Sequence, residues 1–338
     1  MIKKLIYSII LSFIFVVLSA TSVQADEVMG GYTVEPVPNS HQIDPDLGYF
    51  FLCEKEGTKD CLGVKLINSS DQTKVLKVVV TNANTNYNGL LDYTGKIKDN
   101  KDLKQPLTSI VKTTQSEVTV PAKSEVETTL DVKMPKDKFS GVIVGGIVIS
   151  EKNDDSTTKH EKEIMVENKY NYTIGVVLTN DANTRMNQHI SVSLEKVAPV
   201  LSDGRKIIQA DILNPYSYIF DKASVTGEIR EKNSDKILQK QEKTNVNIAP
   251  HSVYPFQFDW KKDELKAGDY VFSGVVQASG KKWVLEQPFK ITSSSAKEIN
   301  EKSIYHVIIP QWLKISWLIV LLVNIVGTSY LVFKYSKK

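Results

Sequence analysis

Cysteine and histidine are scarce in this chain, and the common catalytic signatures are missing. The 338 residues include two cysteines and five histidines, and neither a His-Glu-x-x-His nor a Gly-x-Ser-x-Gly motif occurs. The histidines lie on separate, mostly polar segments, so we interpret each as a solvated surface side chain: His41, His160, His189, His251 and His306. We therefore expect no catalytic residue, no metal site and no cofactor.

The chain also lacks a strong excess of charge of either sign. Its formal net charge is +3, and lysines at the two ends supply more positive charge than that: Lys3, Lys4, Lys334, Lys337 and Lys338. The long middle of the chain is therefore slightly acidic. A basic patch for nucleic acid is not indicated, and we expect no nucleic-acid partner.

Long apolar runs are confined to the two ends. At the N-terminus, two lysines precede an apolar stretch that ends in Val23-Gln24-Ala25, the pattern of a signal peptide cleaved after Ala25. We assign residues 1–25 to it, and a retained first membrane helix is the alternative.

At the C-terminus, residues 315–333 contain no charge and are followed by a basic tail. This pattern predicts a juxtamembrane linker (294–312), a transmembrane helix (313–333) and a cytoplasmic tail (334–338). A buried helix of a globular domain is the alternative. The predicted protein is a single-pass cell-membrane protein whose ectodomain lies outside the cell and whose C-terminus is cytoplasmic.

Between the ends the sequence alternates apolar and polar residues in short runs rich in Val, Ile, Thr and Tyr. Examples are "TKVLKVVVTN" (73–82), "YNYTIGVVLTN" (170–180) and "SVYPFQFDW" (252–260). Such runs, split by turn residues, predict an all-β fold. The length exceeds one sandwich of about 100 residues. We predict two tandem immunoglobulin-like β-sandwich domains, at 30–180 and 187–293, joined near 178–188.

The stretch "SGVIVGGIVISEK" carries Gly141, Gly145 and Gly146 among apolar residues. A phosphate-binding loop would place a helix after its glycines, whereas a charged strand ending follows here. The favoured interpretation is a strand with a bulge or with a neighbour that packs closely.

Cys53 and Cys61 flank a turn at Gly57. In an exported chain such a spacing is typical of a disulfide that pins a hairpin, and two free thiols are the alternative. Two thiolates without a nearby histidine do not fill a zinc shell.

The segment "TNANTNYNGLLDY" (81–93) is the best candidate for a binding site. It combines amides and phenols, which hydrogen-bond and stack on amino sugars or peptides. Asn and Gly at turns are the structural alternative. The candidate residues are Asn82, Asn84, Asn86, Tyr87, Asn88, Asp92 and Tyr93.

Several stretches, taken in order, resemble the WxL-interacting proteins of Gram-positive bacteria. They are "YTVEPVPN", "TNANTNYNGLLDYTG", "LDVKMPKDKFSGVIVGGIVISEK", "NKYNYTIGVVL", "ILNPYSY", "NIAPHSVYPFQFDW" and "LKAGDY". The resemblance implies a first domain that binds peptidoglycan and a second that binds host extracellular-matrix proteins. It also implies partnership with secreted WxL-domain proteins. The cysteine-bearing stretch "YFFLCEKEGTKDCLGVKLIN" departs from the family pattern.

Three functional classes follow from these observations. The favoured one is a non-catalytic, membrane-anchored scaffold that binds peptidoglycan, WxL-domain proteins and host proteins. The alternative is a surface-assembly chaperone or pilus-type subunit that acts by pairing strand edges. A wall hydrolase is third, since carboxylates on separate strands can meet in the fold.

Overall fold

A computed structural model describes residues 29–152, 170–305 and 311–336. The predicted signal peptide (1–25) lies outside these residues, as do His160 and His306.

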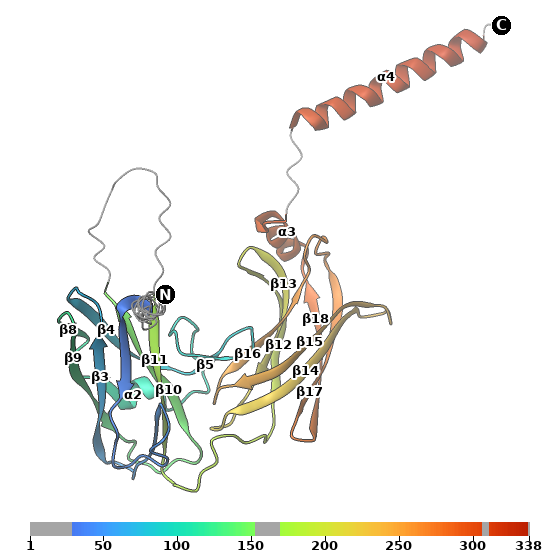
Figure 1. Cartoon of the computed structure of the whole chain (residues 1–338). Helices are drawn as coiled ribbons and strands as arrows, with labels where there is room; N and C mark the ends of the chain where they lie inside the picture. The colour runs from blue at the N-terminus through green and yellow to red at the C-terminus, as the bar shows by residue number, and fades with distance from the viewer. Residues whose placement is uncertain (1–28, 153–169, 306–310, 337–338) are drawn as a thin grey trace, which may run out of the picture.

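The described chain consists mainly of β-strands (Figure 1). The first strands are β1 (Tyr32–Pro36), β2 (Phe50–Cys53), β3 (Lys59–Asn68), β4 (Lys74–Asn82), β5 (Asn84–Thr85), β6 (Leu91–Asp92), β7 (Val111–Thr113), β8 (Glu117–Val120), β9 (Ser124–Lys133), β10 (Ile143–Glu151) and β11 (Asn171–Thr179). The later strands are β12 (Ser193–Ser202), β13 (Arg205–Leu213), β14 (Phe220–Glu231), β15 (Ile237–Ile248), β16 (Val253–Asp259), β17 (Gly268–Ala278) and β18 (Lys281–Ile291). The helices are η1 (Met29–Gly31), α2 (Leu107–Ile110), α3 (Ser293–Lys302) and α4 (Gln311–Ser336).

The alternation seen in the sequence is the alternation of burial along the strands. In β16, Tyr254, Phe256 and Phe258 are buried, while the residues between them are half-exposed. Successive side chains of a strand point to opposite faces, so one face of β16 lines a core. The predicted all-β class is confirmed.

The strands form two sheet pairs, each with its own core. In the N-terminal sandwich, a sheet ordered β1-β3-β9-β7 faces one ordered β2-β11-β10-β4-β8, and residues such as Leu66, Leu76 and Ile147 fill the space between them. In the C-terminal sandwich, β12-β13-β16 faces β15-β14-β17-β18 around an aromatic-rich core. Figure 1 shows the two sandwiches side by side, with the β5–β6 hairpin between them.

Gly145 and Gly146 of the glycine-rich stretch lie in strand β10, which pairs with β4 and β11, whereas Gly141 precedes the strand with a φ of 84°. A Cβ at Gly145 would clash with the carbonyl oxygen of Thr81, and one at Gly146 would lie 3.1 Å from the ring of Tyr93. The glycines therefore admit close neighbours, and the interpretation as a closely packed strand is confirmed.

The two cysteines lie on strands of different sheets. Cys53 ends β2, which pairs with β11, whereas Cys61 lies in β3, between β1 and β9. The hairpin that a disulfide was expected to pin is therefore not formed. Both thiols are free in the structure.

The predicted C-terminal anchor requires a correction. Helix α3, at the start of the predicted linker, is capped by Thr292 and buries Ala296 and Ile299 in the C-terminal core. A span needs about 20 mostly apolar residues to cross the hydrocarbon core. Among the residues that the structure describes, no helix is both long and apolar enough to do so. The prediction of a single-pass anchor at 313–333 with a cytoplasmic tail at 334–338 is therefore wrong.

Candidate functional site

Two asparagines of the predicted binding segment are hydrogen-bonded to the carboxylate of Asp99. Asn82 and Asn84 are both buried, and their amide nitrogens donate to the two oxygens of Asp99 at 2.6 and 2.8 Å. The amide oxygen of Asn82 also accepts from the backbone N–H of Thr108 at 3.0 Å. These two amides fix the loop around Asp99, so their donors already have partners.

The middle of the segment is a tight turn with an exposed tip. The side-chain oxygen of Asn86 accepts from the backbone N–H groups of Asn88 and Leu90 at 2.9 and 3.2 Å. Side chains of Asn and Asp commonly close turns in this way. Tyr87 is 44% and Leu90 52% exposed, and Asn88 is also exposed. The tip thus offers a phenol, an amide and an apolar group to solvent.

The end of the segment returns to the sheet. Asp92 accepts from the backbone and hydroxyl of Thr94 at 2.9 and 2.6 Å, which closes a second turn. The ring of Tyr93 packs over Gly146, and burial, followed by the nearby Tyr49, raises the pKa of its phenol to about 12. Asp92 and Tyr93 are therefore held in the protein, unlike the exposed tip.

The segment forms part of the junction between the two sandwiches. The hydroxyl of Thr85 accepts from the backbone N–H of Ala249 at 2.9 Å, and Asn247 N–H donates to the carbonyl of Gly89 at 2.7 Å. Apolar side chains from both sandwiches meet beside these bonds in a cluster of Ala83, Val142, Val144, Val177, Ile219 and Ala249. The segment was predicted as a binding surface, and what the structure shows is that it joins the sandwiches.

A polar cleft of about 380 Å³ opens at this junction. On one side lies the loop of residues 97–101, and on the other lie Glu195 of β12 and Val253 of β16. Asn100 bridges the cleft by donating to Glu195 at 3.2 Å. Lys98 and Lys101 are exposed at its wall. Groups of both charges and an amide therefore converge in one concave site.

A second cavity, of about 270 Å³, lies between β10 and two turns, one with Ser217 between β13 and β14 and one with His251 between β15 and β16. The hydroxyl of Ser217 and Nε2 of His251 are 2.9 Å apart. Burial lowers the pKa of His251, against opposing contributions from Asp102 and the Pro215 carbonyl. The expectation that His251 is a solvated surface residue is wrong, because the junction encloses it.

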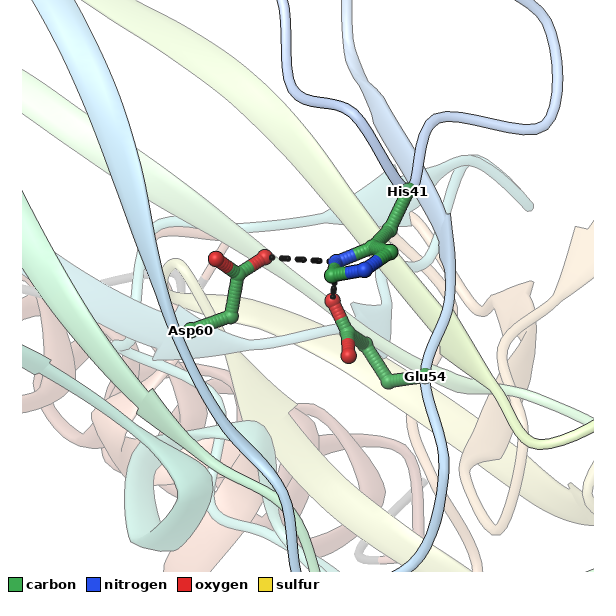
Figure 2. A group of neighbouring side chains, drawn as sticks. All are labelled: His41, Glu54 and Asp60. Atoms are coloured by element: carbon green, nitrogen blue, oxygen red, sulfur yellow. Dashed lines mark hydrogen bonds and ion pairs between the residues drawn. The ribbon is translucent and has the colours of Figure 1, made fainter.

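Sequence reasoning missed a cluster beside the end of β11 in the N-terminal sandwich. His41, Glu54 and Asp60 point toward one another (Figure 2), with one possible ligand atom from each within 4.8 Å of the others. His41 is not simply solvated, since two carboxylates contact its ring. His41 is too far from Glu54 and Asp60 in the sequence for the three residues to form a recognisable motif. The one local signal is that each acid is next to a cysteine, in "CEK" (53–55) and "KDC" (59–61).

Two family models match the chain, one after the other. The peptidoglycan binding domain of WxL Interacting Protein matches residues 32–151, and the host binding domain of WxL Interacting Protein matches residues 161–301. No curated protein matches the chain.

Some solved structures of bacterial chaperones are weakly similar. The class 5 fimbriae chaperone CfaA is 14% identical, with 76% of this chain and 98% of that chain covered and a TM-score of 0.28. The E. coli chaperone DraB is 10% identical, with 77% of this chain and 98% of that chain covered and a TM-score of 0.29. A chain of the CsuC-CsuE chaperone-tip adhesion subunit pre-assembly complex from Acinetobacter baumannii is 11% identical. The match covers 75% of this chain and 97% of that chain, with a TM-score of 0.31. With TM-scores this low, these similarities support no functional conclusion.

Proposed function

The chain belongs to the WxL-interacting protein family, and on that premise we propose that it is a non-catalytic binding scaffold of the cell surface. The N-terminal sandwich, within the predicted domain 30–180, binds peptidoglycan. The C-terminal sandwich, within 187–293, binds a host extracellular protein. Secreted WxL-domain proteins are the partners that complete the surface complex. The observation that carries this proposal is the ordered match of both family models.

The polar cleft and the exposed turn beside it are the proposed contact surface for peptidoglycan. Peptide stems of peptidoglycan carry carboxylates and amides, which suit Lys98, Lys101 and Asn100 as donors. Tyr87 and Asn88 offer stacking and hydrogen bonding at the exposed tip. The remaining predicted residues position this surface through bonds inside the protein: Asn82, Asn84, Asn86, Asp92 and Tyr93.

A hydrolase would require two acids in an open cleft. Glu54 and Asp60 do meet, but Glu54 is only 3% exposed, so a sugar ring has no access to its carboxylate. Accessible geometry is the first requirement for an acid or base. This burial supports binding without cleavage.

Strand pairing remains the second candidate function, because β15 forms an edge of its sheet. Its length of 12 residues would offer a long template for an added strand. Lys240 and Lys243 lie in this edge strand, and Lys236 directly precedes it. Lysines at edges typically prevent strand addition. The scaffold proposal is therefore preferred.

Co-sedimentation of the full chain with purified peptidoglycan, beside a zymogram, tests these functions. We expect sedimentation without a cleared zone, and we expect Lys98→Glu/Lys101→Glu to reduce it at least about tenfold, as lost charge-assisted bonds would. Lys282→Glu/Lys290→Glu, with the same charge change on exposed positions of β18, is the control. A cleared zone would support the hydrolase. Capture of a secreted partner without sedimentation would support strand pairing.

A further inference from the structure

His41, Glu54 and Asp60 come from three different elements. His41 lies in the loop between β1 and β2, Glu54 directly follows β2, and Asp60 is the second residue of β3. Figure 2 shows the imidazole between the two carboxylates. The convergence is a product of the fold, because β2 and β3 belong to different sheets.

Backbone hydrogen bonds hold these elements in place. The N–H of Cys53 donates to the carbonyl of His41 at 3.0 Å, and the N–H of Glu54 donates to the carbonyl of Thr179 at 2.9 Å. The side chain of Asn180 donates to the carbonyl of Glu54 at 2.7 Å. Three chain segments are therefore fixed before any ligand binds, which is a requirement of a selective site.

Asn39 orients both of the more exposed groups. Its amide nitrogen donates to Oδ2 of Asp60 at 2.8 Å, and its amide oxygen accepts from the backbone N–H of His41 at 2.8 Å. Supporting bonds of this kind commonly orient the ligands of metal sites.

The carboxylate of Glu54 is the least satisfied member of the cluster. Oε2 accepts from Thr58 at 3.3 Å. Oε1 forms an ion pair with Nδ1 of His41 at 2.7 Å and has no further hydrogen-bond partner, and the side chain is 3% exposed. A buried carboxylate oxygen that contacts the imidazole of His41 and lies beside a second carboxylate is in a position that favours a cation.

The distances suit an ion of small radius. Nδ1 of His41 is 3.3 Å from Oδ2 of Asp60. Two ligands of a tetrahedral zinc ion, each about 2.1 Å from the metal, are about 3.4 Å apart. Oε1 of Glu54 is 2.7 Å from Nδ1 of His41. This distance would have to increase by less than about 1 Å for both atoms to bind the same zinc ion. His41 is half-exposed, which leaves an entry path and room for a water ligand.

We propose that Nδ1 of His41, Oε1 of Glu54 and Oδ2 of Asp60 bind a divalent metal ion of the zinc class, with water as the fourth ligand. One imidazole and two carboxylates are a set that zinc accepts. The bound ion ties the β1–β2 loop, the end of β2 and the start of β3 together beside the end of β11. It therefore stabilises the N-terminal sandwich next to the connection that leads to the C-terminal sandwich.

Isothermal titration of the purified, metal-stripped full chain with Zn²⁺ tests the proposal. The titration is made in a Cys53→Ser/Cys61→Ser background, because free thiols so close in sequence can bind zinc themselves. We expect one site per chain and a thermal transition that rises with Zn²⁺ concentration, as it does for any ligand specific to the folded state.

His41→Ala and Asp60→Asn are each expected to weaken binding by at least about tenfold. The matched control is Asp46→Asn, an exposed carboxylate of the same loop, which should bind as the parent does. Circular dichroism shows whether each variant is folded. Absence of saturable binding in the cysteine-free chain, or binding that neither variant weakens, would overturn the proposal and leave His41 as an ion-pair partner only. Neither result bears on peptidoglycan binding.

Discussion

The hydroxyl of Thr85 and the backbone N–H of Ala249 are joined by a buried hydrogen bond of 2.9 Å across the boundary of the two sandwiches. The hydroxyl of Ser252 lies 3.2 Å from the same oxygen. Thr85 is fully buried, so water does not compete for these groups. The two sandwiches are therefore coupled by a polar contact as well as by the apolar cluster at Ala83 and Val144.

Replacing Thr85 by valine tests this coupling, because valine keeps the shape and removes the oxygen. Thr85→Val leaves the N–H of Ala249 without an acceptor. An unsatisfied buried donor costs about 1–3 kcal/mol, so we expect the free energy of unfolding to fall by that amount in urea titrations of the full chain. Thr119→Val, at an exposed position of β8, is the control. Equal effects of the two variants would contradict the coupling.

The glycines of β10 allow a second stability test. A Cβ at Gly145 would clash with the Thr81 carbonyl and the side chain of Leu107, whereas a Cβ at Gly48 would meet nothing within 4 Å. Since overpacking a core typically costs about 1–3 kcal/mol, Gly145→Ala is expected to destabilise the chain by at least that much. Gly48→Ala should be nearly neutral. Comparable thermal transitions for both variants would show that β10 and β4 tolerate separation.

The sequence was sufficient for those features that depend on neighbouring residues. The alternation of Tyr254, Phe256 and Phe258 with polar neighbours predicts a half-buried strand because burial in a strand has a period of two. The close packing at Gly145 was likewise predicted from glycine within an apolar strand. Each inference rests on local chemistry, and each is confirmed.

Features that depend on distant residues could not be predicted in this way. Asn82 and Asn84 suggested a ligand site, but in the fold both amides donate hydrogen bonds to Asp99, which is 17 and 15 residues away in the sequence. His41 suggested a solvated side chain because nothing in sequence places Glu54 and Asp60 against it. Partners that are far apart in the sequence cannot be recognised from it, because the pairing of the strands determines which loops come together. The predicted anchor failed for another reason, because a run without charge does not by itself establish a membrane span.

His251 makes the junction sensitive to acid. Burial lowers its pKa below 6.5, while Asp102 and the Pro215 carbonyl oppose that effect, and Lys104 lines the same cavity. A lowered pKa means that the folded state binds this proton less readily than the unfolded state. The contribution of neutral His251 to folding stability is complete above pH 6.5 and is lost as the pH falls from there through the pKa of His251 in the folded state.

Urea midpoints of the full chain, measured between pH 7.5 and about 5, check this dependence. We expect His251→Gln to lose less stability on acidification than the parent. Ser217→Ala removes the hydroxyl that contacts Nε2 but keeps the imidazole buried, so it should retain the pH dependence of the parent. If His251→Gln and the parent respond identically to acid, the buried imidazole is not the titrating group.

The two cysteines should differ in their reactivity. Both are free, but Cys61 is exposed whereas Cys53 is half-buried. Burial raises the pKa of the Cys53 thiol, and the nearby carboxylates of Asp181 and Glu54 raise it further. The thiolate is the nucleophile, so at neutral pH we expect iodoacetamide to modify Cys61 first and Cys53 more slowly, with two adducts in the end and no reductant required. Intact-mass time courses of the parent, Cys53→Ser and Cys61→Ser assign each step. An unchanged mass in the parent, together with modification of both single variants, would show a disulfide and would require β2 and β3 to approach each other more closely than they do in this fold.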